Sequence, residues 1–440
     1  MIRILVYPNI TFQKDLNKDS YIIVIKNVIE VLNKMRDDLY FVMLLPAKID
    51  YLNLPNVEQR IYPQPTYPPS MRIHFNFDDL SRLIRPEDEF DLVYCHLPEH
   101  AKQLKIFFDS YTQERPDFIG YCHWFEVKEN ASYPQTSFWT NIMGVLEMKQ
   151  LGVNSKWLKD LIIERAAERL NSDTIRDLDN IIQPHYLGVD SIDLEPVEKI
   201  PNSILFNHRA GAYTGLKFFL DAMDELYLRR QDFTVYLTTA DANRPYIKKM
   251  NISDRQEYFK FLKTMTVGVG TFQGYSAWSI SVTDGFSRGL PYLLPYGYCY
   301  PEMLGEHYPL FHNGKQDIFL MQLERCLDPQ DDYLNAGRQF IKDKITSFLW
   351  ENRVPEWFDN WQILNELSRD NETPVLLEIV KKIHIKGVMT KTAIIKWRNW
   401  GRDIKFTPYR RMLRNQPDIK ITKTGYESKI NPPKMQGFFE

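Results

Sequence analysis

The stretch that most constrains the fold of this chain is 266–296, TVGVGTFQGYSAWSISVTDGFSRGLPYLLPY. Thr266–Thr271 is a short β-branched run with two glycines, which is typical of a buried parallel strand. A Gln-Gly pair interrupts the chain, Tyr275–Arg288 has the pattern of a helix ended by a glycine, and Pro291–Pro295 resumes an apolar strand. The sequence therefore predicts a strand–turn–helix–strand unit. Free backbone N–H groups at the start of such a helix favour an anion, for example a diphosphate.

Length and composition bound the class of protein. A chain of 440 residues, 44% of them hydrophobic, has material for two ordinary domains and a smaller one. No apolar run approaches the ~20 residues of a membrane helix, and a predicted strand at the start leaves no signal peptide. The cysteines stand singly, without metal-site spacing, and are expected as reduced thiols: Cys95, Cys122, Cys299 and Cys326. We expect a soluble, cytoplasmic, monomeric protein.

Strands and helices alternate twice along the chain. The first series has predicted strands at Ile2–Tyr7, Tyr40–Leu45, Asp91–His96 and Asp117–Cys122, with 58–76 irregular. The second has predicted strands at Ser203–Phe206, Phe233–Leu237 and in the unit above, with helices at 211–228, 253–263, 315–327 and 333–348. Alternation of this kind implies parallel sheets covered on both faces. The predicted fold class is α/β, with two doubly wound, Rossmann-like domains facing a cleft.

Charge is distributed unevenly along the chain. Residues 379–440 contain 15 Lys/Arg and 4 Asp/Glu, a net charge of +11, whereas the first 378 residues carry −13. A basic end on an acidic body indicates a polyanionic partner at that end.

The basic end has its own pattern of elements. Val375–Ile385, Thr390–Gly401 and Thr407–Asn415 read as three helices, and 419–430 as a hairpin around a glycine. This order resembles a winged helix–turn–helix, with 407–415 as its recognition helix and the hairpin as its wing. The side chains expected to face DNA are Arg402, Arg410, Arg411, Arg414, Lys420 and Lys423. The alternatives are a membrane-surface element and a solvated basic tail.

The 266–296 stretch also resembles the donor-binding signature of retaining GT-B glycosyltransferases. In that family two acidic residues, separated by seven others, precede a small-x-Gly-x-Pro run. Here Asp284-Gly-Phe-Ser-Arg-Gly-Leu-Pro291 matches the second half, while Ser276 stands in the first acidic place. The resemblance implies that Asp284 binds the nucleotide ribose and that Ser276 lies near the transferred sugar, with Tyr275 and Ser279 also in the donor site. The alternative is an ordinary strand–helix unit in which Asp284 is solvated.

The resemblance also implies a division of the chain. Ile181–Asp190 resembles the hinge before the second domain of the family. The expected parts are an acceptor domain at 1–190, a donor domain at 191–348, crossover helices at 349–371 and the basic winged helix at 372–440.

Asn207–Gly215 resembles the phosphate-binding loop of the same family. Arg209 takes the arginine place, where a guanidinium stabilises the charge that grows on a departing diphosphate. Thr214 stands in the lysine place, and Lys217 is either a substitute for that lysine or a solvated helix residue. The alternative for Arg209 is an ordinary surface ion pair.

The first domain offers candidates at the edge where open α/β sheets bind ligands. His123 resembles the histidine that retaining GT-B enzymes, phage DNA glucosyltransferases among them, place beside the transferred sugar; the alternative is a core histidine. Glu126 is expected to reach the cleft, and His96 and Glu99 to contact the acceptor. No metal or other cofactor is predicted, because Arg209 and the helix N-terminus take the role of a cation.

The function that this resemblance implies is sugar transfer from a UDP-sugar to DNA. The expected enzyme is a retaining hexosyl- or pentosyltransferase that glycosylates the hydroxymethyl group of modified pyrimidines, most simply 5-hydroxymethylcytosine, in double-stranded phage DNA. The alternatives are a glycosyltransferase of surface polysaccharide synthesis and a non-catalytic DNA-binding regulator that senses a nucleotide sugar.

Overall fold

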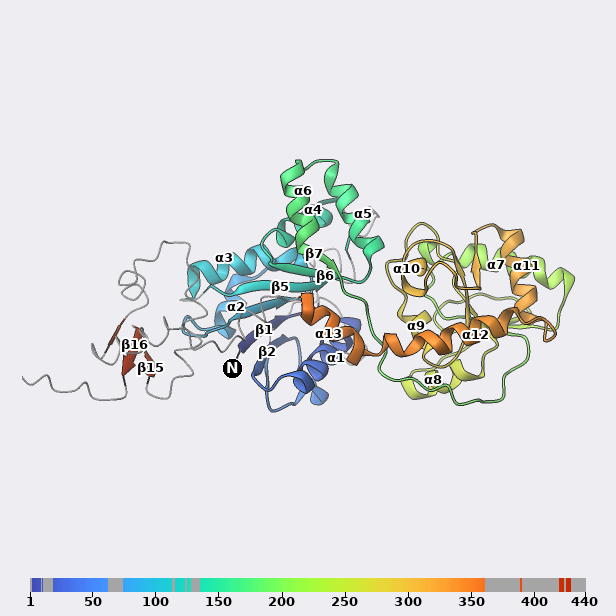
Figure 1. Ribbon diagram of the computed structural model, residues 1–440, viewed down its shortest axis with the longest axis horizontal. Coiled ribbons are helices and arrows are strands. Elements are labelled where there is room, and N and C mark those ends of the chain that lie inside the picture. Colours follow the sequence, from blue (N-terminus) through green and yellow to red (C-terminus); the bar gives the residue numbers. More distant parts are fainter. Residues whose placement is uncertain are drawn as a thin grey trace, which may run out of the picture.

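The structure is a computed structural model that describes residues 2–8, 10, 19–61, 74–112, 115–122, 125–127, 135–360, 388–389, 419–422 and 425–428. Two parallel sheets, each with helices on both faces, form two domains that lie side by side (Figure 1). The predicted α/β class with two doubly wound domains is confirmed. No helix among the described residues has both the length and the apolar character needed to cross a bilayer.

The first sheet has the strand order β3-β2-β1-β4-β5-β6-β7, and its neighbouring strands pair in parallel. The strands are β1 Ile2–Tyr7, β2 Leu39–Leu45, β3 Val57–Ile61, β4 Leu92–Cys95, β5 Asp117–Cys122, β6 Gln150–Val153 and β7 Ile182–Pro184. The helices are α1 Ser20–Met35, α2 Phe77–Leu83, α3 Ala101–Tyr111, α4 Gln135–Val145, α5 Lys156–Ala167 and α6 Ser172–Ile181. The order of the strands reverses between β1 and β4, so the loops after these strands diverge there.

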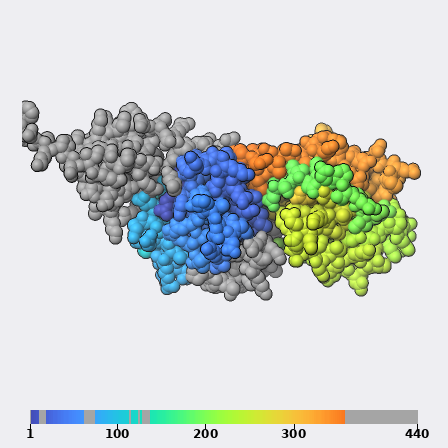
Figure 2. All heavy atoms as spheres, turned by 90° about the horizontal axis from the view of Figure 1, so that it is seen from below, coloured from blue at the N-terminus to red at the C-terminus, as the bar shows by residue number. Residues whose placement is uncertain are grey.

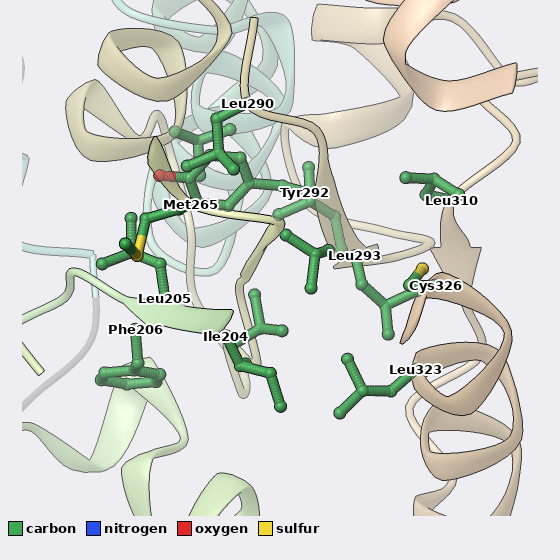
Figure 3. Packing of buried hydrophobic residues seen from close by; sticks show 14 of the residues in the cluster. Ile204, Leu205, Phe206, Met265, Leu290, Tyr292, Leu293, Leu310, Leu323 and Cys326 are labelled. Carbon is green, nitrogen blue, oxygen red and sulfur yellow. The ribbon is translucent and has the colours of Figure 1, made fainter. Parts of the chain in front are cut away.

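The second sheet has the order β10-β9-β8-β11-β12-β13, and its neighbouring strands also pair in parallel. The strands are β8 Ser203–Phe206, β9 Thr234–Leu237, β10 Ile247–Lys249, β11 Val267–Val269, β12 Tyr292–Pro295 and β13 Phe311–His312. The helices are α7 Leu216–Arg229, α8 Arg255–Thr264, α9 Ile280–Phe286, α10 Tyr300–Leu304, α11 Gln316–Leu327 and α12 Tyr333–Lys344. Figure 3 shows part of its core, where side chains of β8 and β12 meet those of α11. The strand order reverses between β8 and β11.

The chain crosses back to the first domain after α12. Helix α13, Trp350–Asn360, packs against α1, and its Trp357 is fully buried in the core of the first domain. The Trp357 ring stacks on Tyr121 with 4.8 Å between centroids, and its Nε1 donates to the Tyr186 carbonyl at 3.0 Å. Figure 2 shows the orange segment that contains α12 and α13 running along one edge of both domains. The second domain is thereby connected twice to the first.

Contacts between the domains concentrate at the start of α5. The carboxylate of Glu302, on α10 of the second domain, accepts hydrogen bonds from the backbone N–H groups of Lys156 and Trp157 and from the Tyr186 hydroxyl. The Trp157 ring meets Tyr275 edge-on, with 5.4 Å between centroids. A carboxylate from one domain therefore caps a helix of the other.

The predicted start of the helix at 275–288 is wrong, because α9 begins only at Ile280. Tertiary contacts hold residues 275–279 out of helical geometry. The Ser276 carbonyl accepts a hydrogen bond from the Cys299 N–H at 3.2 Å, and Ala277 packs into the core of the first domain.

The prediction that residues 58–76 form no regular structure is also wrong for its first part, because residues 58–61 belong to β3. This strand lies at the edge of the sheet and its residues are half-exposed, so it lacks the apolar run of a central strand.

Three short strands are described in the basic C-terminal segment. β15 Ile419–Thr422 and β16 Gly425–Ser428 pair antiparallel, which confirms the predicted hairpin. β14 Val388–Met389 pairs with the other edge of β16. The three helices predicted in this segment lie outside the described residues.

Candidate functional site

A cavity of about 320 Å³ opens at the carboxyl ends of β8 and β11, where the strand order of the second sheet reverses. Ligands of open α/β sheets bind at such a reversal because the loops that follow the two strands separate there. Most lining residues follow β8 or β11, and three come from the first domain or the hinge: Ser20, Asn154 and Leu187. Both domains therefore build the cavity.

The loop after β8 carries the positive charge of this cavity. Arg209 is exposed and lines the cavity, and within the described part of the chain no carboxylate pairs with its guanidinium. The ion-pair alternative for Arg209 thus has no partner among these residues. A cation in this position is free to meet an anionic ligand.

Thr214 holds this loop in shape. Its Oγ1 lies 2.8 Å from the Arg209 carbonyl and 2.7 Å from the Gly211 carbonyl, so its hydroxyl proton is used within the loop. The next residue, Gly215, has φ 69°, and a Cβ there would lie 1.8 Å from the Thr271 carbonyl oxygen. Only glycine fits this close approach to the loop after β11. Lys217 does not line the cavity; its side chain is exposed and pairs with Asp221.

The loop after β11 forms the opposite wall. Tyr275, Ser276 and Ser279, three of the residues predicted to bind the donor, all line the cavity. Ser276 is 3% exposed, and its Oγ lies 3.1 Å from the Tyr300 hydroxyl and 3.9 Å from the Cys299 sulfur. Trp278 also lines the cavity, and its buried Nε1 has no acceptor among the described residues. The residues of this wall therefore include a buried hydroxyl at Ser276 and an indole N–H without an acceptor among the described residues at Trp278.

Sequence reasoning did not assign a role to His208, which lies between these two walls. Its Nε2 is 3.0 Å from the Val269 carbonyl and its Nδ1 is 2.9 Å from Ser281 Oγ. Burial lowers the pKa of His208 to about 4, although the bond to the carbonyl opposes this shift. The imidazole is therefore neutral at physiological pH. The signal available in the sequence was only its position two residues after a strand.

Asp284 lies on α9 but not in the lining of the cavity. Its carboxylate is 6% exposed and lies 3.2 Å from Arg255, which also reaches Asp190 in the hinge at 3.5 Å. Burial raises the pKa of Asp284 to about 6, against the opposing effect of Arg255. The solvated alternative for Asp284 is wrong, because this carboxylate is buried and paired.

This burial leads to a prediction for Asp284→Asn. The folded-state pKa of about 6 exceeds the ordinary 3.8, so ionised Asp284 destabilises the fold above pH 6 and the penalty vanishes below pH 4. We expect the asparagine variant to be about 1–3 kcal/mol more stable than the parent at pH 7.5 and equally stable at pH 4. Urea unfolding at both pH values measures this difference.

Asp193→Asn is the matched control for that experiment. A hydrogen bond from Lys263 lowers the pKa of Asp193, so this variant should lose stability at neutral pH, the opposite sign. An Asp284→Asn effect that is the same at both pH values would contradict the prediction.

None of the first-domain candidates that the structure describes lines this cavity. Glu126 is 5% exposed and His96 fully buried, and neither lines it. The His96 ring packs between Tyr21 and Tyr121. Glu99 is 1% exposed and lines a separate cavity between α3 and α4. The structure thus does not bring His96, Glu99 or Glu126 together with Arg209.

The remaining predicted residues cannot be placed. His123, Arg402, Arg410, Arg411, Arg414 and Lys423 lie outside the described residues, and of Lys420 only its backbone in β15 is described. Across the described ranges, no three His, Cys, Asp or Glu side chains are grouped as metal ligands.

The fold of the two domains also occurs in solved structures of other proteins. No protein-family model and no curated protein matches the sequence. Among solved structures, sucrose-phosphate synthase from Thermosynechococcus elongatus superposes with a TM-score of 0.62 at 12% identity, covering 84% of this chain and 100% of that one. Anabaena HepE in complex with UDP and glucose gives 0.59 at 12% identity, with coverages of 84% and 100%. A glycosyltransferase from Rickettsia africae gives 0.57 at 14%, with coverages of 82% and 98%. The two domains therefore have the GT-B glycosyltransferase fold.

Proposed function

We propose that this chain is a glycosyltransferase that takes a sugar from a UDP-sugar bound in the cavity between its two domains. The observation that carries the proposal is the cavity itself. It lies at the strand-order reversal of the second sheet, it is closed by both domains, and it contains Arg209 without a carboxylate partner among the described residues. The presence of UDP in HepE, which shares the fold, supports the same choice of donor.

The chemistry follows from the place of Arg209. In transfer with retention, the bond between the anomeric carbon and the diphosphate breaks while a new bond to the acceptor oxygen forms on the same face. The acceptor proton passes to the departing diphosphate. Arg209 stabilises the negative charge that grows on this group. No metal ion is needed for these steps.

DNA is the acceptor that the basic segment favours. The +11 charge of residues 379–440 offers sequence-independent affinity for phosphates, and the β15–β16 hairpin lies where the wing is expected. The acceptor group in this proposal is the hydroxymethyl of a modified pyrimidine, most simply 5-hydroxymethylcytosine. A base in duplex DNA has to leave the stack to reach a cavity between two domains, so base flipping accompanies the transfer.

One experiment tests the donor and the acceptor together. The protein is incubated with hydroxymethylated or plain duplex DNA and a panel of UDP-sugars, and the nucleosides are then analysed by mass spectrometry. A hexose or pentose mass added only to hydroxymethylated nucleosides is the expected result. Transfer to a glycan acceptor instead of DNA would move the function to surface polysaccharide synthesis. Nucleotide-sugar and DNA binding without transfer to either acceptor would favour a regulator.

Ser276 is expected to influence which sugar is accepted. Ser276 is almost fully buried, and its hydroxyl lies next to that of Tyr300. A glutamate at this position adds volume and a negative charge at the wall of the cavity. We expect Ser276→Glu to change the order of preference among UDP-sugars or to abolish transfer, measured as initial rates across the panel. Ser276→Ala, which removes the hydroxyl without adding charge, is the control. Identical preferences for Ser276→Glu and the parent would show that this position does not contact the sugar.

A further inference from the structure

Asn207, a residue that lines the cavity, has a buried side-chain oxygen without a hydrogen-bond donor among the described residues. This residue is 5% exposed, and its Nδ2 lies within 2.8–3.0 Å of the Tyr258 hydroxyl, the Ser281 carbonyl and the Tyr292 hydroxyl. A carbonyl can only accept, and the Tyr292 hydroxyl already donates to that same carbonyl at 3.1 Å. The amide nitrogen must therefore face these groups, which fixes the flip of the side chain.

In this orientation of the amide, Asn207 Oδ1 remains as a hydrogen-bond acceptor. No donor reaches it among the residues that the structure describes. Buried acceptors without a partner are rare in folded proteins, and each requires an explanation. Since Asn207 lines the cavity, a ligand that donates a hydrogen bond supplies one.

A second acceptor results from the tautomer of His208. The Val269 carbonyl can only accept, so the proton of the neutral imidazole is on Nε2 and Nδ1 is an acceptor. Ser281 Oγ lies 2.9 Å from Nδ1 and must donate its only proton there. The lone pairs of Ser281 then remain for other donors, and the Ser279 hydroxyl at 3.2 Å can fill only one of them.

We propose that Asn207 Oδ1 and Ser281 Oγ form an acceptor pair that binds hydroxyl groups of the nucleotide sugar, with His208 as the positioning residue that keeps Ser281 an acceptor. The inference rests on the proposed function and states which groups of the nucleotide sugar Asn207 and Ser281 bind. The Asn207 amide donates to the Ser281 carbonyl, so the two acceptors are neighbours at the point where the two walls meet. Diphosphate oxygens carry no proton to give and belong beside Arg209. The hydroxyls come either from the ribose or from the transferred sugar.

Calorimetric titrations of the full chain distinguish these two sources. The ligands are UDP-glucose, UDP, and UDP analogues that lack the 2′- or 3′-hydroxyl. We expect Ser281→Ala to weaken binding about five- to tenfold for every ligand that carries the hydroxyl bound by Ser281, and to leave unchanged the binding of the ligand that lacks it. A loss for UDP and UDP-glucose alike assigns the ribose, whereas a loss for UDP-glucose alone assigns the sugar. Removing a hydroxyl bound by Asn207 should weaken binding equally in parent and variant.

Ser287→Ala is the matched control in this series. Ser287 follows the last residue of the same helix and is more buried than Ser281, but its hydroxyl donates to the Asp284 carbonyl and does not line the cavity. This variant should bind all four ligands like the parent. An equal loss for every ligand in Ser281→Ala, or a loss for none, would overturn the acceptor pair. Failure of the unchanged chain to bind any of them would overturn the proposed function as well.

The role of His208 has its own test in His208→Phe. The ring lies edge-on to Phe206 and Phe272, so phenylalanine keeps the packing but removes the acceptor for the Ser281 proton. Ser281 is then free to donate into the cavity. We expect UDP-glucose to bind about five- to tenfold more weakly, as in Ser281→Ala, while inorganic diphosphate binds at least as well as to the parent. Equal weakening of both ligands would reduce His208 to a structural role and overturn its positioning function.

Discussion

Replacing Arg209 by alanine is expected to lower the turnover of sugar transfer by about 10²-fold or more while leaving affinity for DNA nearly unchanged. The physical reason is that Arg209 is the exposed guanidinium of the cavity, and the loop that carries it is fixed by Thr214 and by the close approach of Gly215 to Thr271. A cation held in place before the reaction begins stabilises the developing diphosphate charge without a cost of reorganisation. Single-turnover rates with saturating UDP-sugar measure the effect on the chemical step.

Lys217→Ala provides the comparison for Arg209→Ala. Lys217 carries the same charge close by in sequence but is exposed, pairs with Asp221 and does not line the cavity. Its removal should leave the rate of the chemical step within about twofold of the parent, as for an ordinary surface ion pair. Parent-like turnover in Arg209→Ala would remove this residue from the mechanism, and a large loss in Lys217→Ala would restore it as the substitute for the family's lysine.

Removing the chain after Asn371 is expected to abolish most affinity for duplex DNA. The removed piece carries a net charge of +9 and the remainder −11, so the body that is left repels a polyanion. At about 50 mM salt the loss should be on the order of 10³-fold, and binding of the full chain should weaken steeply as salt increases. The measurement is a salt titration of duplex binding for both chains. A triple alanine variant at Arg410, Arg411 and Arg414 should approach the truncated chain.

The same truncation should leave the two sheet domains folded. The residues described in the three hydrophobic cores all lie at or before Trp357, so the truncated chain keeps every one of them. The truncated chain should therefore bind UDP like the full chain, which serves as the internal control. Duplex binding by the truncated chain as tight as that of the full chain would refute the assignment of a DNA-binding segment and favour a glycan acceptor.

The four central strands of the second sheet, β8, β9, β11 and β12, were predictable from the sequence because burial on both faces demands continuous apolar runs, whereas the short edge strands β10 and β13 were not predicted. Ser203–Phe206 is a strand with the predicted bounds, and Pro291–Pro295 differs from β12 by one residue. The start of α9 was not predictable. Residues 275–279 have no local signal against helix, and it is the contacts of Ser276 with Cys299 and of Ala277 with the first domain that keep them extended. Such contacts exist only once the domains have come together.

The candidate site was predictable in position and less so in its individual residues. Arg209 and Ser276 line the cavity because loops after β8 and β11 meet at the reversal of strand order. Asp284, in contrast, is three residues after Ser281 on α9, and its side chain forms an ion pair with Arg255 on α8. Asn207 and His208 have no pattern that separates them from other polar residues after a strand. Their roles depend on which neighbours can donate and which can only accept.

The cap that Glu302 provides to α5 also determines how the protein can move. The bonds from the backbone N–H groups of Lys156 and Trp157 go to the charged Glu302 carboxylate, so each contributes about 1.5–3 kcal/mol. Rotation about the hinge would break these bonds and would also withdraw Ala277 from the core of the first domain, in which it packs. The cap also fixes the register in which the two domains meet, because one carboxylate has to face the same two amides.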